Sequence, residues 1–173
     1  KTYGPHQGIM AIRKNLGNLL PNQGHFFNAA ALYKRFTPAG PDHAQIAASA
    51  GMIAYFEDLA AQHGITGSAS EKGQGVHDLM RDHETALLQP MLDYLGSKNS
   101  VRVLGPMEAE NRAPTVALAT QSDPAALALQ LSAHGIMTAS GSFYADRALQ
   151  SQNIAPEPGV LRLSFVHYTA QSD

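Results

Sequence analysis

Apolar residues recur at steps of three and four along two stretches of the chain, which is the spacing of one face of an α-helix. Asp42 is placed to cap the first stretch. Pro90 lies inside the second stretch, where we expect it to kink or break the helix because proline lacks an amide donor. The pattern predicts helices over 42–62 and 76–95, with apolar faces formed by Ile46, Ala50, Ile53, Phe56 and Ala60 and by Val76, Leu79, Met80, His83, Leu87, Met91 and Leu95.

The segment before the first helix is rich in glycine and proline and shows no sustained periodicity. Residues 8–12 are short, apolar and bounded by glycine, which predicts a buried strand. Residues 14–40 are predicted to be mostly loop, with a short helix around 29–34. Residues 1–95 therefore comprise a strand, a loop and two long helices, which do not form an obviously complete domain.

After Gly96 the pattern changes to short apolar segments separated by turns. In the last segment, apolar residues alternate with Arg162 and Ser164, so that the two sets face opposite sides of a strand. The pattern predicts a compact α+β domain over 96–173, with strands over 100–104, 115–120, 136–139 and 160–166 and helices over 123–134 and 143–150.

The composition narrows the class of protein. The 173 residues carry a formal net charge of −2 and are 15% charged, which excludes a strongly basic nucleic-acid-binding protein. No apolar run approaches the roughly 20 residues of a transmembrane helix, so we predict no membrane span. The chain contains no cysteine, which excludes a disulfide framework, a cysteine zinc site and a cysteine nucleophile within this stretch. We therefore predict a cytoplasmic protein.

Both ends of the chain are typical of a segment taken from a longer protein. The chain begins at Lys1 rather than at methionine, and residues 1–5 do not fit a signal peptide. At the other end, Ser172 and Asp173 resemble the cap of a helix that does not follow. We expect the chain to be part of a longer protein.

Two basic residues are candidates for chemistry. Lys1 precedes a Gly-Pro turn and a predicted strand, and a lysine that is held rigidly and desolvated becomes a nucleophilic amine. The alternative is an ordinary solvated lysine. Arg162 is isolated on the polar side of an apolar strand, and its guanidinium matches a carboxylate. The alternative is a structural ion pair with an acidic residue of the chain.

Histidines and glycines supply weaker candidates. Gly40 and His43 flank the start of the first predicted helix, where free amides favour a phosphate, although Asp42 would repel an anion. The alternative is a plain helix start. The acidic and histidine residues of 77–84 do not match the His-Glu-x-x-His zinc spacing, so we predict no metal site there. We expect His83 to be a packed histidine on the apolar helix face.

Four segments, in order along the chain, resemble motifs of the class V aminotransferases. Residues 1–5 resemble the lysine motif of the family, and residues 39–41 resemble its Gly-Thr-Pro loop. Residues 135–145 are similar to its Gly-Ile…Gly-His-x-x-Ala segment, and residues 161–169 resemble its closing Arg-x-Ser-x-x-x-Tyr-Asn-Thr strand. The family includes cysteine desulfurases and isopenicillin-N-epimerase-like proteins.

The resemblance implies the α/β fold of the pyridoxal-phosphate-dependent transferases of fold type I. Residues 1–95 would be the end of the large cofactor-binding domain, and residues 96–173 the small C-terminal α+β domain. Lys1 would form the Schiff base with pyridoxal 5'-phosphate and move the Cα proton of the substrate, while Arg162 would bind the α-carboxylate of an amino acid. Gly40 and His43 would complete the cofactor-binding residues, because the Gly40 loop would approach the cofactor phosphate of the other subunit in a homodimer.

The sequence also departs from the family. Pro41 replaces the loop threonine, and residues 142–144 lack the catalytic cysteine that a desulfurase carries near this position. We therefore expect an aminotransferase, an epimerase or a lyase rather than a classical cysteine desulfurase. In this fold the acid that pairs the pyridine nitrogen lies before the lysine, so we expect the 173 residues alone to be inactive. The alternative is a non-catalytic dimerisation or ligand-binding module that uses the helices over 42–62 and 76–95.

Overall fold

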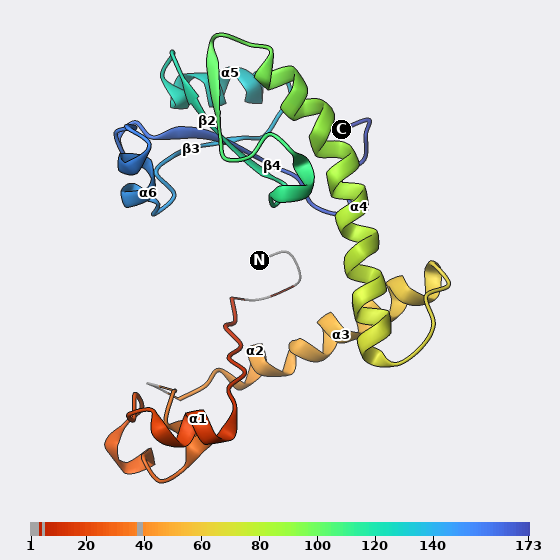
Figure 1. Cartoon of the computed structure of the whole chain (residues 1–173), viewed down its shortest axis with the longest axis vertical. Helices are drawn as coiled ribbons and strands as arrows, with labels where there is room; N and C mark the ends of the chain where they lie inside the picture. The colour runs from red at the N-terminus through yellow and green to blue at the C-terminus, as the bar shows by residue number, and fades with distance from the viewer. Residues whose placement is uncertain (1–3, 5, 38–39) are drawn as a thin grey trace. The chain divides into compact units, whose positions relative to one another are not determined.

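The computed structural model describes residues 4, 6–37 and 40–173 (Figure 1). The chain forms two compact units, unit 1 over Lys1–Gly73 and unit 2 over Gln74–Asp173. The boundary between them falls inside the longest helix, α4 (Ala69–Gly96). The predicted division into 1–95 and 96–173 stays a prediction, and each unit is described by itself.

Unit 1 begins with irregular structure and short helices. Residues 8–12 form neither helix nor strand, so the predicted strand is wrong. Ile9 and Met10 are 74% and 62% exposed, and the described part of unit 1 holds no strand with which they could pair. The segment predicted to be mostly loop contains α1 (Lys14–Leu19) and two 3₁₀ turns, η1 (Phe26–Asn28) and η2 (Leu32–Lys34).

The first predicted long helix is confirmed, with one interruption. It is divided at Ala48 into α2 (His43–Ala47) and α3 (Ser49–Gln62). Asp42 caps it as predicted, because its Oδ1 accepts hydrogen bonds from the amides of Ala44 and Gln45 at 3.0 and 3.1 Å. The apolar face is covered only at its end, since Ala60 is buried whereas Ile46 and Ile53 remain about half to two-thirds exposed.

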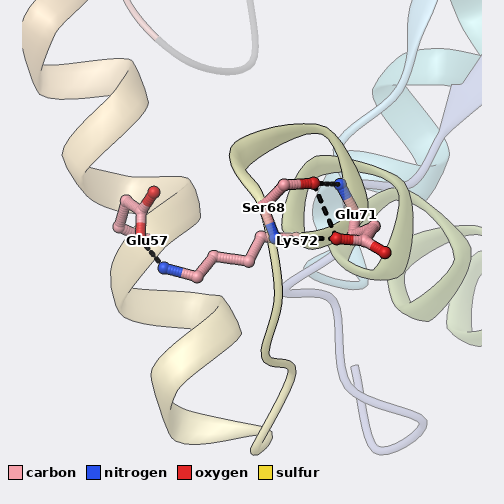
Figure 2. Close-up of polar contacts among 4 residues, drawn as sticks. All are labelled: Glu57, Ser68, Glu71 and Lys72. Atoms are coloured by element: carbon pink, nitrogen blue, oxygen red, sulfur yellow. Dashed lines mark hydrogen bonds and ion pairs between the residues drawn. The ribbon is translucent and has the colours of Figure 1, made fainter.

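The second predicted helix is also confirmed, and α4 begins seven residues earlier than 76. Figure 2 shows the reason: the Ser68 amide donates to Glu71 Oε2 at 2.8 Å, and the Glu71 amide donates to Ser68 Oγ at 3.3 Å. This reciprocal arrangement is a capping box, which satisfies two amides at a helix start. Lys72 Nζ also reaches Glu57 Oε2 on α3 at 2.7 Å. The helix continues through Pro90 without a break, held by the buried Leu88 and Leu92.

Unit 2 contains the predicted order of strand, strand, helix, strand, helix and strand. The elements are β1 (Val101–Leu104), β2 (Thr115–Thr120), α5 (Pro124–Ala133), β3 (Ala139–Gly141), α6 (Asp146–Ser151) and β4 (Val160–Ser164), with a 3₁₀ turn η3 (Ala109–Asn111) between β1 and β2. The sheet has the order β1-β2-β4-β3, and each neighbouring pair is antiparallel. The C-terminal α+β architecture is therefore confirmed.

Two elements of unit 2 start three residues later than predicted. Residues 136 and 137 stay outside the sheet, and Met137 is 92% exposed, so β3 begins at Ala139. Phe143 and Tyr144 have positive φ angles of 53° and 62°, which an α-helix does not permit, so α6 begins only at Asp146.

The core of unit 2 lies on one face of the sheet. Leu88 and Leu92 of α4 form a cluster with Val116 and Leu118 of β2 and Leu161 of β4, and apolar residues of α5 pack against it. Because side chains alternate along a strand, Arg162 lies on the opposite face. Within the described residues, no helix is long and apolar enough to cross a membrane. The cytoplasmic location stays a prediction.

Candidate functional site

Arg162 lies in the interior of the sheet of unit 2. Its strand, β4, is paired on both sides, and Arg162 lies opposite Ala117 of β2 and Ala139 of β3. The side chain is half-buried. Both cross-strand neighbours are alanines, so the side chains next to Arg162 on the two adjoining strands are short.

The guanidinium of Arg162 contacts an aromatic ring instead of an acid. Its Cζ lies 4.0 Å from the centroid of the Phe143 ring, which is the geometry of a cation–π contact. Across residues 4, 6–37 and 40–173, neither of the two ion pairs involves Arg162. Arg162 therefore forms no structural ion pair with a described residue. Its guanidinium, which matches the geometry of a carboxylate, is available to bind a carboxylate from a ligand.

A tightly packed turn holds Phe143 in this position. Gly141 has a φ of 130°, and it is followed by the left-handed residues Phe143 and Tyr144. The Ala145 amide donates to the Ser142 carbonyl at 2.9 Å, which closes the turn. Gly159, with φ of 81°, lies so close to Gly141 that a Cβ on it would lie 2.3 Å from the Gly141 carbonyl carbon. The turn over 141–145 is therefore positioned by backbone contact with the chain that enters β4.

Phe143 was not among the residues singled out from the sequence. The segment that contains it was selected for its glycine and alanine positions, and nothing in that spacing points to a contact with Arg162. The only local signal was an aromatic pair, Phe143 and Tyr144, directly before a short predicted helix. The contact joins residues on two different elements, so only the sheet pairing reveals it.

The predicted cofactor residues Gly40 and His43 belong to unit 1. Gly40 and Pro41 line a cavity of about 290 Å³ together with aromatic and polar residues of 25–37. His43 is the exposed first residue of α2. The amides of Ala44 and Gln45 are already bonded to Asp42, so a phosphate near Gly40 would meet the loop backbone rather than free helix amides.

Lys1 lies outside the described residues, as does Ala39 of the Gly40 loop. The role predicted for Lys1 therefore stays a prediction. Gly40 and His43 fall in unit 1 and Arg162 falls in unit 2.

The charged face of α4 has structural contacts. His83 is exposed rather than packed, which corrects the prediction, and its Nε2 lies 2.8 Å from the Thr169 carbonyl oxygen. A hydrogen bond from His77 lowers the pKa of Asp78, with a smaller contribution from Gln74, whereas burial raises the pKa of Glu84. Among the described residues, no group of three or more His, Cys, Asp or Glu is placed to hold a metal ion.

The family model described as "Aminotransferase class-V" matches residues 73–173, more than half of the chain. The chain belongs to the class V aminotransferases. The sheet with Arg162 and the turn over 141–145 both lie within the matched residues.

Two relatives extend this comparison. The chain is similar to an aminotransferase-like protein, FGM3, of Gibberella zeae, with 28% identity over 175 residues that cover 97% of this chain and 40% of that protein. Its fold resembles the apo structure of a cysteine desulfurase from Thermococcus onnurineus NA1, with a TM-score of 0.57 and 23% identity over 79% of this chain and 30% of the other. The fold is thus that of the pyridoxal-phosphate-dependent transferases of fold type I, and this class V aminotransferase chain spans well under half the length of the relatives it matches.

Proposed function

We propose that the protein containing this chain is a pyridoxal-phosphate-dependent enzyme that acts on an amino acid, as an aminotransferase, an epimerase or a lyase. The observation that carries the proposal is the half-buried guanidinium of Arg162, which has no acidic partner among the described residues and is stacked on Phe143. A cation left unneutralised in a partly buried place is suited to a ligand that brings its own negative charge.

Each proposed role uses the chemistry of one side chain. Pyridoxal 5'-phosphate, when bound, supplies the electron sink for reactions at the Cα of the amino acid. Arg162 binds the α-carboxylate through two parallel N–H···O bonds, which orients the Cα. Lys1 would hold the cofactor through its Nζ and, once the amino group of the substrate has displaced that amine, Nζ would accept the Cα proton. Gly40 and His43 contribute to binding of the phosphate, Gly40 through its backbone.

The residues of this chain fit the substrate side of such a site better than the cofactor side. The Arg162 fork has the geometry and charge that a carboxylate needs. The chain carries no cysteine, so a persulfide on a cysteine of these 173 residues does not enter the proposal. The remaining cofactor ligands would lie on parts of the protein beyond this chain, and we propose that the 173 residues alone are inactive.

The test uses the full-length protein loaded with pyridoxal phosphate. The change in visible absorption of the cofactor is titrated with a panel of amino acids, for wild type, Arg162→Gln and Arg102→Gln. Arg102 is a matched control because it lies on β1, on the same face of the sheet, and its guanidinium donates to the Gln152 carbonyl. We expect Arg162→Gln to weaken binding by about tenfold or more, from the loss of a charge-assisted pair.

Two results would contradict the proposal. Equal weakening by Arg162→Gln and Arg102→Gln would show a general charge effect rather than carboxylate recognition. A cofactor spectrum unchanged by Lys1→Ala would show that another residue holds the cofactor.

We further propose that the protein is a homodimer, and the partly exposed apolar face of α3 supports an interface between subunits. Met52, Ile53 and Phe56 line a cavity of about 390 Å³ with Lys72 in unit 1. A non-catalytic dimerisation module, the second candidate function, is favoured by the same face. Sedimentation of the full-length protein as a monomer at high concentration would contradict both interface proposals and leave the enzyme proposal standing.

A further inference from the structure

The turn over 141–145 is strained at the residue that contacts Arg162. Phe143, with φ of 53°, and Tyr144, with φ of 62°, are consecutive residues in the left-handed region, which residues with a Cβ rarely occupy. Two such residues persist only where their surroundings determine the conformation. Here the surroundings are the Gly141–Gly159 backbone contact and the hydrogen bond from the Ala145 amide to Ser142.

The conformation separates the two aromatic side chains. The Phe143 ring lies against Arg162, whereas Tyr144 is fully exposed to solvent. In an ordinary helical start the two residues would instead sit about 100° apart on one helix surface. The left-handed backbone conformation therefore places the Phe143 ring on the Arg162 guanidinium.

The ring constrains Arg162 without using its donors. A cation–π contact occupies one side of the guanidinium and leaves all five N–H groups free to bind an acceptor. The cross-strand neighbours Ala117 and Ala139 are too short to hold the long side chain by packing. The ring contact with Phe143 restricts the orientation of the Arg162 guanidinium.

We propose that Phe143 is a positioning residue that holds the Arg162 guanidinium in the orientation needed to bind a carboxylate. The proposal rests on the proposed function, since Arg162 must bind the substrate carboxylate. Arg162 without the ring would sample several rotamers, and binding a carboxylate would then require ordering the side chain. Phe143 acts through Arg162 and does not itself touch the substrate.

The experiment measures amino-acid affinity, KM and kcat in the full-length, cofactor-loaded protein. Phe143→Leu keeps an apolar side chain and removes the aromatic face, whereas Phe143→Tyr keeps the face. Phe143→Asn is a third variant. Asparagine tolerates the left-handed region, so this variant removes the ring without adding backbone strain. We expect Phe143→Leu and Phe143→Asn to raise the apparent Kd and KM by about 2- to 5-fold with kcat little changed. Phe143→Tyr should stay close to wild type.

The outcomes separate this proposal from the proposed function. If Arg162→Gln weakens binding and neither Phe143→Leu nor Phe143→Asn does, Phe143 has no positioning role and the carboxylate role of Arg162 stands. If Arg162→Gln leaves binding unchanged, the proposed function of Arg162 fails first. A purely structural Phe143 would lower the urea midpoint of unfolding in Phe143→Leu and Phe143→Asn and leave KM of the folded protein unchanged, which would overturn the positioning role.

Discussion

The backbone of Gly159 lies against the backbone of Gly141, and alanine at position 159 would have no room for its methyl group. A Cβ on Gly159 would lie 2.3 Å from the Gly141 carbonyl carbon and 2.8 Å from the Ser142 amide nitrogen. Carbon atoms in contact prefer about 3.5–4.0 Å, so one of the two segments must move by about 1 Å. Both segments belong to unit 2, and the segment that follows Gly141 carries Phe143.

Two separate costs add up in Gly159→Ala. Gly159 has a φ of 81°, and placing a residue with a Cβ in the left-handed region costs about 1–2 kcal/mol. Overpacking a closely packed place costs a further 1–3 kcal/mol or so. We therefore expect the free energy of unfolding to fall by about 2–5 kcal/mol.

Gly135→Ala measures the cost of the left-handed backbone conformation without the cost of overpacking. Gly135 has nearly the same φ, 80°, and a Cβ on it would meet no atom within 4 Å. Urea unfolding of the full-length variants, followed by far-UV circular dichroism, gives both free energies if the m-values agree. Gly159→Ala should be less stable than Gly135→Ala by about 1–3 kcal/mol. A difference below about 0.5 kcal/mol would show that the close approach of the two glycines is not a feature of the folded protein.

Three further predictions concern contacts outside the candidate site. Ser68→Ala removes the capping box of α4 and should lower stability by about 1 kcal/mol. The same hydrogen bonds from Ser68 lower the pKa of Glu71, so their stabilisation is present above the ordinary glutamate pKa and is lost as the pH falls through the lowered pKa of the folded state. Arg112→Gln removes guanidinium bonds to the carbonyls of Pro106, Leu104 and Thr115 and should cost about 2–4 kcal/mol in urea unfolding. Lys72→Ala breaks a largely exposed ion pair and should cost no more than about 1 kcal/mol, less in 1 M salt.

Each of these predictions has a control or a contradicting result. Arg147→Gln is the match for Arg112→Gln, since Arg147 is exposed on α6, and it should change stability by less than about 0.5 kcal/mol. A Ser68→Ala penalty that does not shrink as the pH falls would contradict the role of the Glu71 carboxylate. A Lys72→Ala effect that is unaffected by salt would indicate lost packing of the lysine stem instead of a lost ion pair.

Local chemistry made the helices and the last strand predictable. Asp42 and Asp123 cap helices in the structure because a carboxylate two or three residues before a free amide bonds to it whatever lies further along the chain. Apolar residues at steps of three and four predicted α3 and α4. The alternation of apolar and polar residues placed Arg162 on the face of β4 away from the core. The start of α4 was misplaced because Ser68 and Glu71 lie before its apolar stripe.

Two strand predictions were wrong because strand pairing decides the structure there. Residues 8–12 are apolar enough for a strand but have no strand beside them within the described part of unit 1. Residues 136–139 were shifted because β3 is set by its register with β4, in which Ala139 lies opposite Arg162. A strand needs a partner for its amides and carbonyls, and no local pattern names that partner.

The sequence by itself determined the helical faces, the caps, the absence of cysteine and the presence of an isolated arginine on the last strand. Only the tertiary structure decided what that arginine contacts. Phe143 reaches Arg162 because β3 pairs with β4 and because two glycines let the backbones at 141 and 159 approach each other. Caps and periodicities act within one or two helical turns, whereas this contact depends on strand pairing and backbone packing between residues far apart in the chain.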